Sequence, residues 1–284
     1  MSAVQILTPT RPALRWHGGK WLLAPWIIEH LPPHRVYVEP FGGAASVLIR
    51  KPRSYAEVYN DLDGEVVNLF RVMRDESTGR ALRDALALTP FSRTEYDGAY
   101  VLAADPLERA RRLVVRSFMG HGSDAPNINR PSGFRANSNK SGTTPARDWR
   151  NFPDALEATI ERLRGVIIES RPALEIMAQH DSAETLHYLD PPYVHETRSR
   201  GRGEYVHEMS LADHATLLAF IQSVRGKVVL SGYPHPLYDT ELTGWRRIER
   251  AALADGARAR TEVLWMNPAA TPHDLFTVSP KEGG

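Results

Sequence analysis

Residues 36–46 read VYVEPFGGAAS, and this stretch decides the fold. Its apolar opening is typical of a buried strand, and the adjacent Gly42 and Gly43 allow the chain to turn tightly. The small residues that follow let a helix begin close to the sheet. A strand, a glycine turn and a helix in this order indicate a ligand site at the carboxyl end of the strand, although a glycine turn taken alone is often only a turn.

The acids around this turn favour a particular kind of ligand. The pattern is not GxGxxG, which argues against a dinucleotide and its pyrophosphate. Glu39 places a carboxyl at the strand end, where it suits a ligand that carries an amino group or a sulfonium. Asp61 ends the next predicted strand, 20 residues beyond Phe41, where an acid can bond both hydroxyls of a ribose. The two acids together favour a cationic ligand that contains adenosine.

Short apolar runs and helical patterns alternate along most of the chain. Strands are predicted at residues 36–38, 55–59, 166–169, 185–189, 227–230 and 262–265. Helices are predicted at residues 20–31, 44–50, 62–74, 80–88, 106–119, 153–163 and 210–224. This alternation predicts an α/β fold with a mostly parallel sheet and helices on both of its faces.

The alternation stops between residues 89 and 151. Residues 120–149 are rich in Gly, Asn, Ser, Pro and Arg and contain few large apolar side chains. A long irregular stretch inside a compact domain is usually functional or disordered, and composition supports a surface loop and an inserted module equally. We therefore predict a core domain of residues 1–88 and 152–284 with an inserted domain of residues 89–151.

Composition excludes several classes of protein. The 284 residues include no cysteine, which excludes disulfides, thiolate zinc sites and a cysteine nucleophile. No apolar run approaches the roughly 18 residues of a membrane span, and no signal peptide is visible, so we expect a soluble, intracellular protein. The net charge of +1 does not indicate a nucleic-acid partner, although basic residues gather within residues 121–150 and 198–202. The histidines, including His195, His207 and His214, lack metal-ligand spacing and are interpreted as solvated or structural.

The tetrapeptide Asp190-Pro191-Pro192-Tyr193 directly follows the predicted strand at residues 185–189. The prolines end the strand and fix the directions of nearby carbonyls. The Asp190 carboxylate and a neighbouring carbonyl accept hydrogen bonds, and Tyr193 offers a flat face, which suits the exocyclic amine of a nucleobase. A proline turn with a surface tyrosine is the plainer alternative, but the position directly after an apolar strand favours function.

A second glycine motif, Trp16-His17-Gly18-Gly19-Lys20, precedes a predicted helix. Lys20 can pair with a ligand carboxylate, and Trp16 can offer an aromatic face. Considered alone, the motif is better explained as a helix entry with an exposed lysine and a core tryptophan.

Taken in order, these motifs resemble the Dam-type DNA adenine-N6 methyltransferases of the D12 class, alpha group. The resemblance runs through residues 16–20, 39–44 and 60–62, then the polar insert, then residues 190–193. It implies a Rossmann-like methyltransferase fold, with a mostly parallel seven-stranded sheet and an inserted small, largely helical DNA-recognition domain. It also implies S-adenosylmethionine as cofactor, double-stranded DNA as partner, no metal, no membrane, a monomer or weak dimer, and the cytoplasm of a bacterial or phage-infected cell.

The resemblance assigns roles to single residues. The implied catalytic residues are Asp190, Pro191, Pro192 and Tyr193, with Asp190 holding the target amine and Tyr193 stacking on an adenine extruded from the duplex. The implied cofactor-binding residues are Trp16, Lys20, Glu39, Phe41, Gly42, Asp61, Glu169 and Asp190. Methyl transfer is expected to be direct and in line, without a covalent intermediate.

DNA contacts are expected from the insert and from the loop after the catalytic motif. The candidates are Arg116, Asn127, Asn129, Arg130, Arg135, Asn137, Lys140, Arg198 and Arg200. Arginine and asparagine suit guanine and adenine edges in the major groove, yet each one taken singly is better explained as a solvated residue or a phosphate contact. The insert lacks the Phe-Asn-x-Pro-Phe-Gly-like string of GATC readers, so the target sequence stays open.

Three alternatives remain at this point. Cytosine-N4 methylation acts on the same kind of amine. The motif Asp190-Pro191-Pro192-Tyr193 favours adenine, whereas a serine in place of Asp190 would favour cytosine-N4. A binding module that has lost catalysis is disfavoured because Lys20, Asp61, Asp190 and Tyr193 are all present. A nicotinamide oxidoreductase is disfavoured by the missing GxGxxG and by Glu39.

Overall fold

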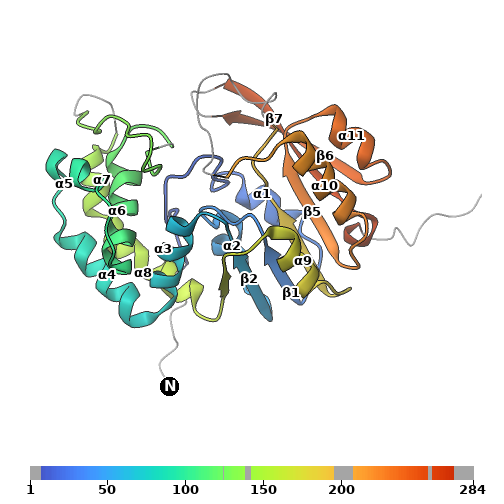
Figure 1. Ribbon diagram of the computed structural model, residues 1–284, viewed down its shortest axis with the longest axis horizontal. Coiled ribbons are helices and arrows are strands. Elements are labelled where there is room, and N and C mark those ends of the chain that lie inside the picture. The colour runs from blue at the N-terminus through green and yellow to red at the C-terminus, as the bar shows by residue number, and fades with distance from the viewer. Residues whose placement is uncertain (1–7, 124, 138–141, 195–206, 255–257, 272–284) are drawn as a thin grey trace, which may run out of the picture.

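A single seven-stranded sheet forms the centre of the protein. The computed structural model describes residues 8–123, 125–137, 142–194, 207–254 and 258–271 (Figure 1). Within them the strand order is β3-β2-β1-β4-β5-β7-β6. The strands are β1 (Val36–Glu39), β2 (Ala56–Asn60), β3 (Ile167–Glu169), β4 (Thr185–Leu189), β5 (Lys227–Gly232), β6 (Arg246–Ala254) and β7 (Arg258–Met266). Strands β1 to β5 are parallel, and β7 runs antiparallel to both β5 and β6, as in a Rossmann-like methyltransferase fold.

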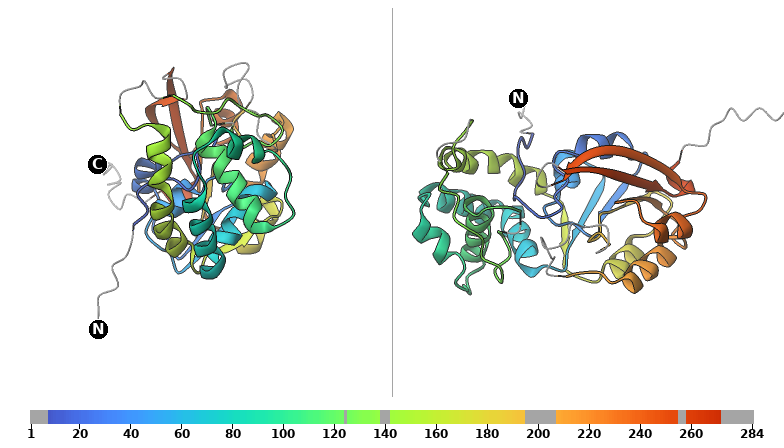
Figure 2. Two further views of the ribbon diagram at one scale, coloured as in Figure 1. Left: turned by 90° about the vertical axis from the view of Figure 1, so that its left-hand side faces the viewer. Right: turned by 90° about the horizontal axis from the view of Figure 1, so that it is seen from above.

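Helices cover both faces of this sheet and also form a separate body beside it. One face carries α1 (Ala24–Glu29) and α2 (Ser46–Arg50), and the other carries α9 (Ala173–His180), α10 (Leu211–Ile221) and α11 (Pro236–Glu241). The helical body contains α3 (Gly64–Arg74), α4 (Glu76–Leu88), α5 (Arg93–Gly98), α6 (Pro106–Met119), α7 (Pro145–Arg150) and α8 (Phe152–Leu163). Two perpendicular views show this body alongside the sheet rather than over its face (Figure 2).

The core follows the alternation of side chains along the strands. On β5, Val229 belongs to the core that lies under α1 and α2, whereas Val228 and Leu230 belong to the core under α10 and α11. Successive side chains of a strand point to opposite faces, so a strand in the middle of a sheet is apolar on both. This explains why the central strands are visible as continuous apolar runs in the sequence.

Helix α6 shows how local signals set the bounds of a helix. The Asp105 side chain accepts a hydrogen bond from the Glu108 backbone amide at 2.8 Å, and Pro106 occupies the first turn. Both features stabilise a helix start, because the first amides of a helix lack partners within it. The helix spans residues 106–119, the bounds that the sequence predicts.

Several elements differ from the sequence-based expectation. Strand β6 and helices α5, α7, α9 and α11 were not predicted. Strand β6 lies at the edge of the sheet and has a partner on one side only. An edge position accommodates charged side chains, and β6 contains Arg246, Arg247, Glu249 and Arg250. A polar edge strand of this kind shows little apolar alternation.

The helical body is larger than the predicted insert of residues 89–151. Helix α4 packs against α6 and α8, and α3 packs against α6. Packing therefore joins α4 and α8, on either side of the predicted boundaries, to the same body. No helix of the described residues is both long and apolar enough to cross a membrane.

Candidate active site

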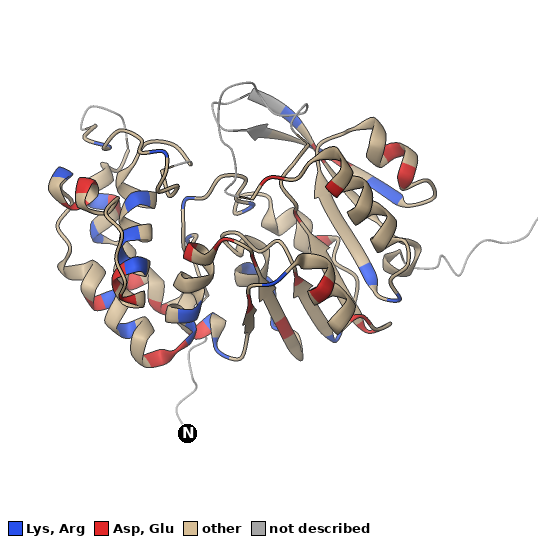
Figure 3. Cartoon of the chain, viewed as in Figure 1, with Lys and Arg blue, Asp and Glu red and all other residues tan. Residues whose placement is uncertain are grey.

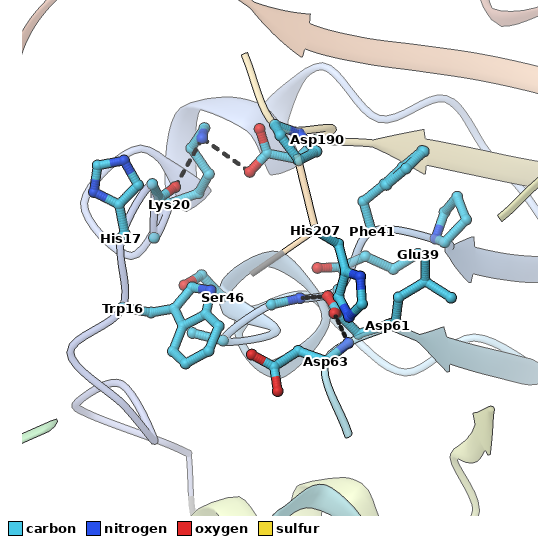
Figure 4. Close-up of a pocket in the computed structure, with 18 of the residues that line it drawn as sticks. Trp16, His17, Lys20, Glu39, Phe41, Ser46, Asp61, Asp63, Asp190 and His207 are labelled. Carbon is cyan, nitrogen blue, oxygen red and sulfur yellow. Dashed lines mark hydrogen bonds and ion pairs between the residues drawn. The ribbon is translucent and has the colours of Figure 1, made fainter. Parts of the chain in front are cut away.

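The candidate site lies where the strand order reverses. The chain passes from β1 outward to β2 and β3, then returns to β4 on the opposite side of β1. Ligands of open α/β sheets bind at the carboxyl ends of the strands at this point. A cavity of about 140 Å³ is found there, lined by the turn after β1, the ends of β2 and β4, and residues 16–20 and 207–209 (Figure 4).

The glycine turn after β1 is shaped by close contact with β2. A Cβ atom on Gly42 would lie 2.2 Å from the Tyr59 ring, so no larger residue fits there without displacing the ring. The Gly42 amide donates to the Asn60 carbonyl at 2.8 Å, which ties the turn to the end of β2. Gly43 follows with a φ of 46°, in the left-handed region that glycine adopts readily.

Asp61 is held at the end of β2 by two backbone amides. Its carboxylate accepts hydrogen bonds from Gly43 at 2.8 Å and from Asp63 at 2.8 Å. Burial raises the pKa of Asp61 to about 6, against these hydrogen bonds, which lower it. Each carboxylate oxygen has two lone pairs, so both oxygens keep capacity for the hydroxyls of a ligand.

Glu39 lies in the wall of the cavity and is already engaged. Its carboxyl accepts hydrogen bonds from the Tyr37 hydroxyl at 2.7 Å and from the Leu48 amide at 3.0 Å. Burial raises the pKa of Glu39 to about 8, and the negative charge of Asp190 adds to this effect. Glu39 is therefore largely protonated near neutral pH, and a cation in the cavity would favour its ionised form.

The two motifs at residues 16–20 and 190–193 meet in the structure. The Lys20 ammonium lies 2.8 Å from one Asp190 carboxylate oxygen, and the Ser231 hydroxyl donates to the other at 2.9 Å. Lys20 also donates to the Gly18 carbonyl at 2.8 Å. Lys20 is thus buried against Asp190, whereas the motif considered alone favours an exposed lysine.

Tyr193 is packed between charged and aromatic neighbours. The Lys20 ammonium lies 4.6 Å from the centre of its ring, and the Tyr233 ring meets it edge-on with 4.6 Å between centroids. The Tyr193 hydroxyl donates to a Glu262 carboxylate oxygen at 2.9 Å. Tyr233 and Glu262 are not among the predicted site residues. The one signal for Glu262 in the sequence is an acid in the otherwise apolar run at residues 262–266.

The remaining cofactor-binding and catalytic candidates differ in whether they line the cavity. Trp16, Phe41 and Pro192 line the cavity, and so does His207, which sequence analysis interpreted as solvated or structural. Glu169, Pro191 and Tyr193 are not among the lining residues. Glu169 ends β3, which is separated from β1 by β2. Its predicted contact with the cofactor has no support from this geometry.

Arg116 corrects one prediction about DNA contacts. The side chain is buried within the helical body, where it donates to the Pro126 carbonyl at 3.0 Å and the Ala99 carbonyl at 2.6 Å. A guanidinium enclosed in this way cannot reach a DNA backbone. Arg116 lies on the buried face of α6, three residues from both Leu113 and Met119, and this helical spacing is the signal in the sequence for its burial.

The other DNA candidates lie on the surface of the helical body or outside the described residues. Asn129 and Arg130 are exposed, and Asn127 accepts a hydrogen bond from the Asn129 amide at 2.9 Å. Arg135 donates to the Phe118 carbonyl at 2.9 Å, and Asn137 is partly buried. Basic and acidic residues are mixed along the helices of this body (Figure 3). The candidates outside the described residues are Lys140, Arg198 and Arg200.

The chemistry of the cavity suits a ligand with positive charge. Among the described residues that line it, the acids are Glu39, Asp61, Asp63, Asp190 and Glu208, and Lys20 is the one Lys or Arg. Trp16 and Phe41 add aromatic surface, and Asp61 offers acceptors for a diol. No group of three or more potential metal ligands occurs among the described His, Cys, Asp and Glu residues.

Comparison with known proteins agrees with this chemistry. The family of D12 class N6 adenine-specific DNA methyltransferases matches residues 16–245. A DNA adenine methylase of Serratia marcescens is 28% identical over 243 residues, which cover 82% of this chain and 85% of that protein. A DNA adenine methylase of Escherichia coli K12 is 26% identical over 192 residues, which cover 65% of each chain.

Proposed function

Because the chain belongs to the D12 class of N6 adenine-specific DNA methyltransferases, an enzyme class that methylates adenine in DNA, we propose that its methyl donor is S-adenosylmethionine. The observation that carries this proposal is the acidic cavity at the carboxyl ends of β1 and β4, whose lining includes Glu39, Asp61 and Asp190. We propose further that the acceptor is the N6 amine of an adenine rotated out of the duplex.

The donor fits the residues that line the cavity. S-adenosylmethionine would supply a methyl group activated by a sulfonium. Asp61 would accept hydrogen bonds from the ribose hydroxyls, and Trp16 and Phe41 would contact the apolar parts of the donor. Glu39 and Asp190 would favour the cationic end of the donor, since carboxylates stabilise a nearby positive charge.

Asp190 and its neighbours would position the acceptor amine. A carboxylate and a fixed backbone carbonyl that both accept from N6 orient the nitrogen lone pair away from the ring plane. The Lys20 ammonium holds the Asp190 carboxylate in place at 2.8 Å. Tyr193 would stack on the extruded base, since aromatic stacking stabilises an unpaired nucleobase.

Target recognition would come from the helical body. We propose that residues 89–151, together with the packed helices α4 and α8, form the recognition unit, with Asn129, Arg130 and Arg135 among the DNA contacts. Exposed Arg and Asn side chains can bind phosphates and the edges of bases. We also propose that the protein acts as a monomer or weak dimer.

The proposal is tested by mass spectrometry of nucleosides. Mixed-sequence duplex DNA is incubated with the protein and S-adenosylmethionine and then digested. N6-methyladenine that is absent with Asp190→Ala would support the proposal. N4-methylcytosine would leave the cofactor proposal standing but contradict adenine as the target, and the absence of any methylated base would favour a binding module that has lost catalysis.

A further inference from the structure

We propose that Glu262 is a positioning residue for methyl transfer, which holds the ring of Tyr193 by accepting a hydrogen bond from its hydroxyl. The ring in turn sets the plane on which the target adenine stacks. The proposal rests on the proposed function of Tyr193 and extends it to a residue on a strand far away in the sequence. Glu262 does not itself touch the reacting atoms.

The position of Glu262 follows from the sheet register. Val263 of β7 pairs with Gly232, the last residue of β5, so Glu262 lies just beyond the carboxyl end of β5. This is the edge of the sheet that carries the cavity. The Glu262 side chain is buried, and its carboxylate accepts from the Tyr193 hydroxyl at 2.9 Å.

Three neighbours hold the Tyr193 ring from different directions. Lys20 contacts its face, Tyr233 meets it edge-on, and Glu262 binds its hydroxyl end. The contacts of Lys20 and Tyr233 allow the ring to slide, because charge–ring and ring–ring interactions tolerate a range of geometries. The hydrogen bond to Glu262 is directional and fixes the hydroxyl end.

A purely structural role explains this carboxyl poorly. Burying an acid is costly, and desolvation raises the pKa of Glu262 above its ordinary value. The next residues on β7, Val263 and Leu264, are buried and apolar, so an apolar side chain would suit the core better. Arg250 faces Glu262 in the register, but its guanidinium lies 5.7 Å from the Trp26 ring, and no ion pair to Glu262 is found among the described residues. The acid supplies an acceptor for the Tyr193 hydroxyl and a negative charge near Lys20, whose positive charge lowers the pKa of Glu262 against the effect of burial.

The test compares three variants with the wild-type protein. Glu262→Leu removes the acceptor, Glu262→Gln keeps an acceptor oxygen, and Tyr193→Phe removes the donor but keeps the ring. Turnover is measured on a duplex that carries the sequence methylated by the wild-type protein. In a second duplex, 2-aminopurine replaces the adenine that is methylated there, and its fluorescence reports extrusion of the base. We expect Glu262→Leu and Tyr193→Phe each to lower turnover about 10- to 100-fold, because small misplacements of a bound group cost this much.

Five further results are expected. Glu262→Gln should retain turnover within a few-fold of wild type, and the affinity for S-adenosylmethionine should change little in any variant. The fluorescence change should be smaller for Glu262→Leu. The double variant Glu262→Leu/Tyr193→Phe should be no slower than the slower of the two single variants, because each substitution removes the same hydrogen bond. Glu249→Leu, an exposed acid on β6, serves as the matched control and should behave as wild type.

Separate outcomes overturn the two proposals. Wild-type kinetics and fluorescence for Glu262→Leu, or additive losses in the double variant, would overturn the positioning role. If Glu262→Leu fails to fold, the comparison of Glu262→Gln with Tyr193→Phe still decides, because equal losses in both would contradict the role of the acceptor. A wild-type protein that makes no N6-methyladenine would instead refute the proposed function.

Discussion

The Asp190 carboxylate pairs with Lys20 and would also bind the acceptor amine. We expect Asp190→Asn to lower turnover about 100- to 1000-fold, the usual loss when one charged group that stabilises a transition state is removed. DNA binding should be retained, because Asp190 lies in the cavity rather than on the helical body. Single-turnover methylation and a gel-shift titration measure the two quantities.

The exposed acid Glu175 on α9 provides the matched control for this substitution. Glu175→Gln should leave both methylation and DNA binding unchanged. Near-normal methylation by Asp190→Asn would show that the carboxylate of Asp190 is not needed for catalysis.

We expect Asp61 to make cofactor binding depend on pH. Its pKa in the folded protein is about 6, above the ordinary value of 3.8, so Asp61 takes up a proton as the pH falls through 6. The neutral acid is a poorer acceptor for ribose hydroxyls. Calorimetry should therefore show the affinity for S-adenosylmethionine falling up to about tenfold per pH unit below pH 6.

Two variants identify the group that causes this pH dependence. Asp61→Asn should bind the cofactor weakly with no inflection near pH 6. Glu39→Gln should keep that inflection, because Glu39 titrates at a pKa of about 8. A flat affinity profile from pH 5 to 8 for the wild-type protein would argue against Asp61 as a cofactor ligand.

The turn between β1 and α2 shows how an element depends on one close contact. We expect Gly42→Ala to destabilise the protein by about 1–3 kcal/mol or more, because the added Cβ would overlap the Tyr59 ring. Gly64→Ala is the matched control, since no atom lies within 4 Å of its added Cβ and its φ is not in the left-handed region. Urea unfolding of both variants measures the difference, and equal stabilities would contradict the close packing.

Helix α6 carries a structural arginine, whereas an exposed arginine lies in the segment that follows it. Arg116→Met should lower the free energy of unfolding by about 2–4 kcal/mol, because it leaves the carbonyls of Ala99 and Pro126 without their donor. Arg130→Ala should leave stability unchanged. It should reduce by about one the slope of the logarithm of the DNA-binding constant against the logarithm of salt concentration. Thermal unfolding and binding titrations at several salt concentrations separate the two.

A different pair of results would support Arg116 as a DNA contact. If Arg116→Met folds with wild-type stability and reduces the salt slope, the side chain contacts DNA phosphates. If Arg130→Ala leaves the salt slope unchanged, Arg130 is a solvated residue with no contact to DNA.

At the scale of the whole molecule, the sheet and the helical body share one core. A single cluster of buried side chains includes Tyr37 and Leu186 of the sheet together with Leu113 and Phe152 of the helical body. Arg11, from the N-terminal segment, also pairs with Asp148 of α7 at 2.9 Å. Such continuity favours cooperative unfolding of both parts.

This continuity leads to a prediction about ligand stabilisation. Far-UV circular dichroism and tryptophan fluorescence should report one unfolding transition. S-adenosylmethionine at 100 times its Kd should stabilise the whole molecule by about 2.7 kcal/mol and shift both signals together. Two separate transitions, with only one shifted by the cofactor, would show that the helical body unfolds independently.

The features that depend on neighbouring residues could be predicted from the sequence alone. The central strands are visible because both their faces are buried, and α6 has its start signals at Asp105 and Pro106. The order of the motifs predicted the family and the sheet, and both predictions are confirmed. The roles assigned to single residues of the site stay predictions.

Contacts between residues that are distant in the sequence could be found in the folded chain alone. The pairing of Lys20 with Asp190 and the contact of Glu262 with Tyr193 each join segments that lie far apart in the chain. Local patterns carry no information about such pairs, because partners are chosen when whole faces of helices and strands pack together. The edge strand β6 escaped prediction for the related reason that its form depends on pairing with β7 rather than on its own apolar alternation.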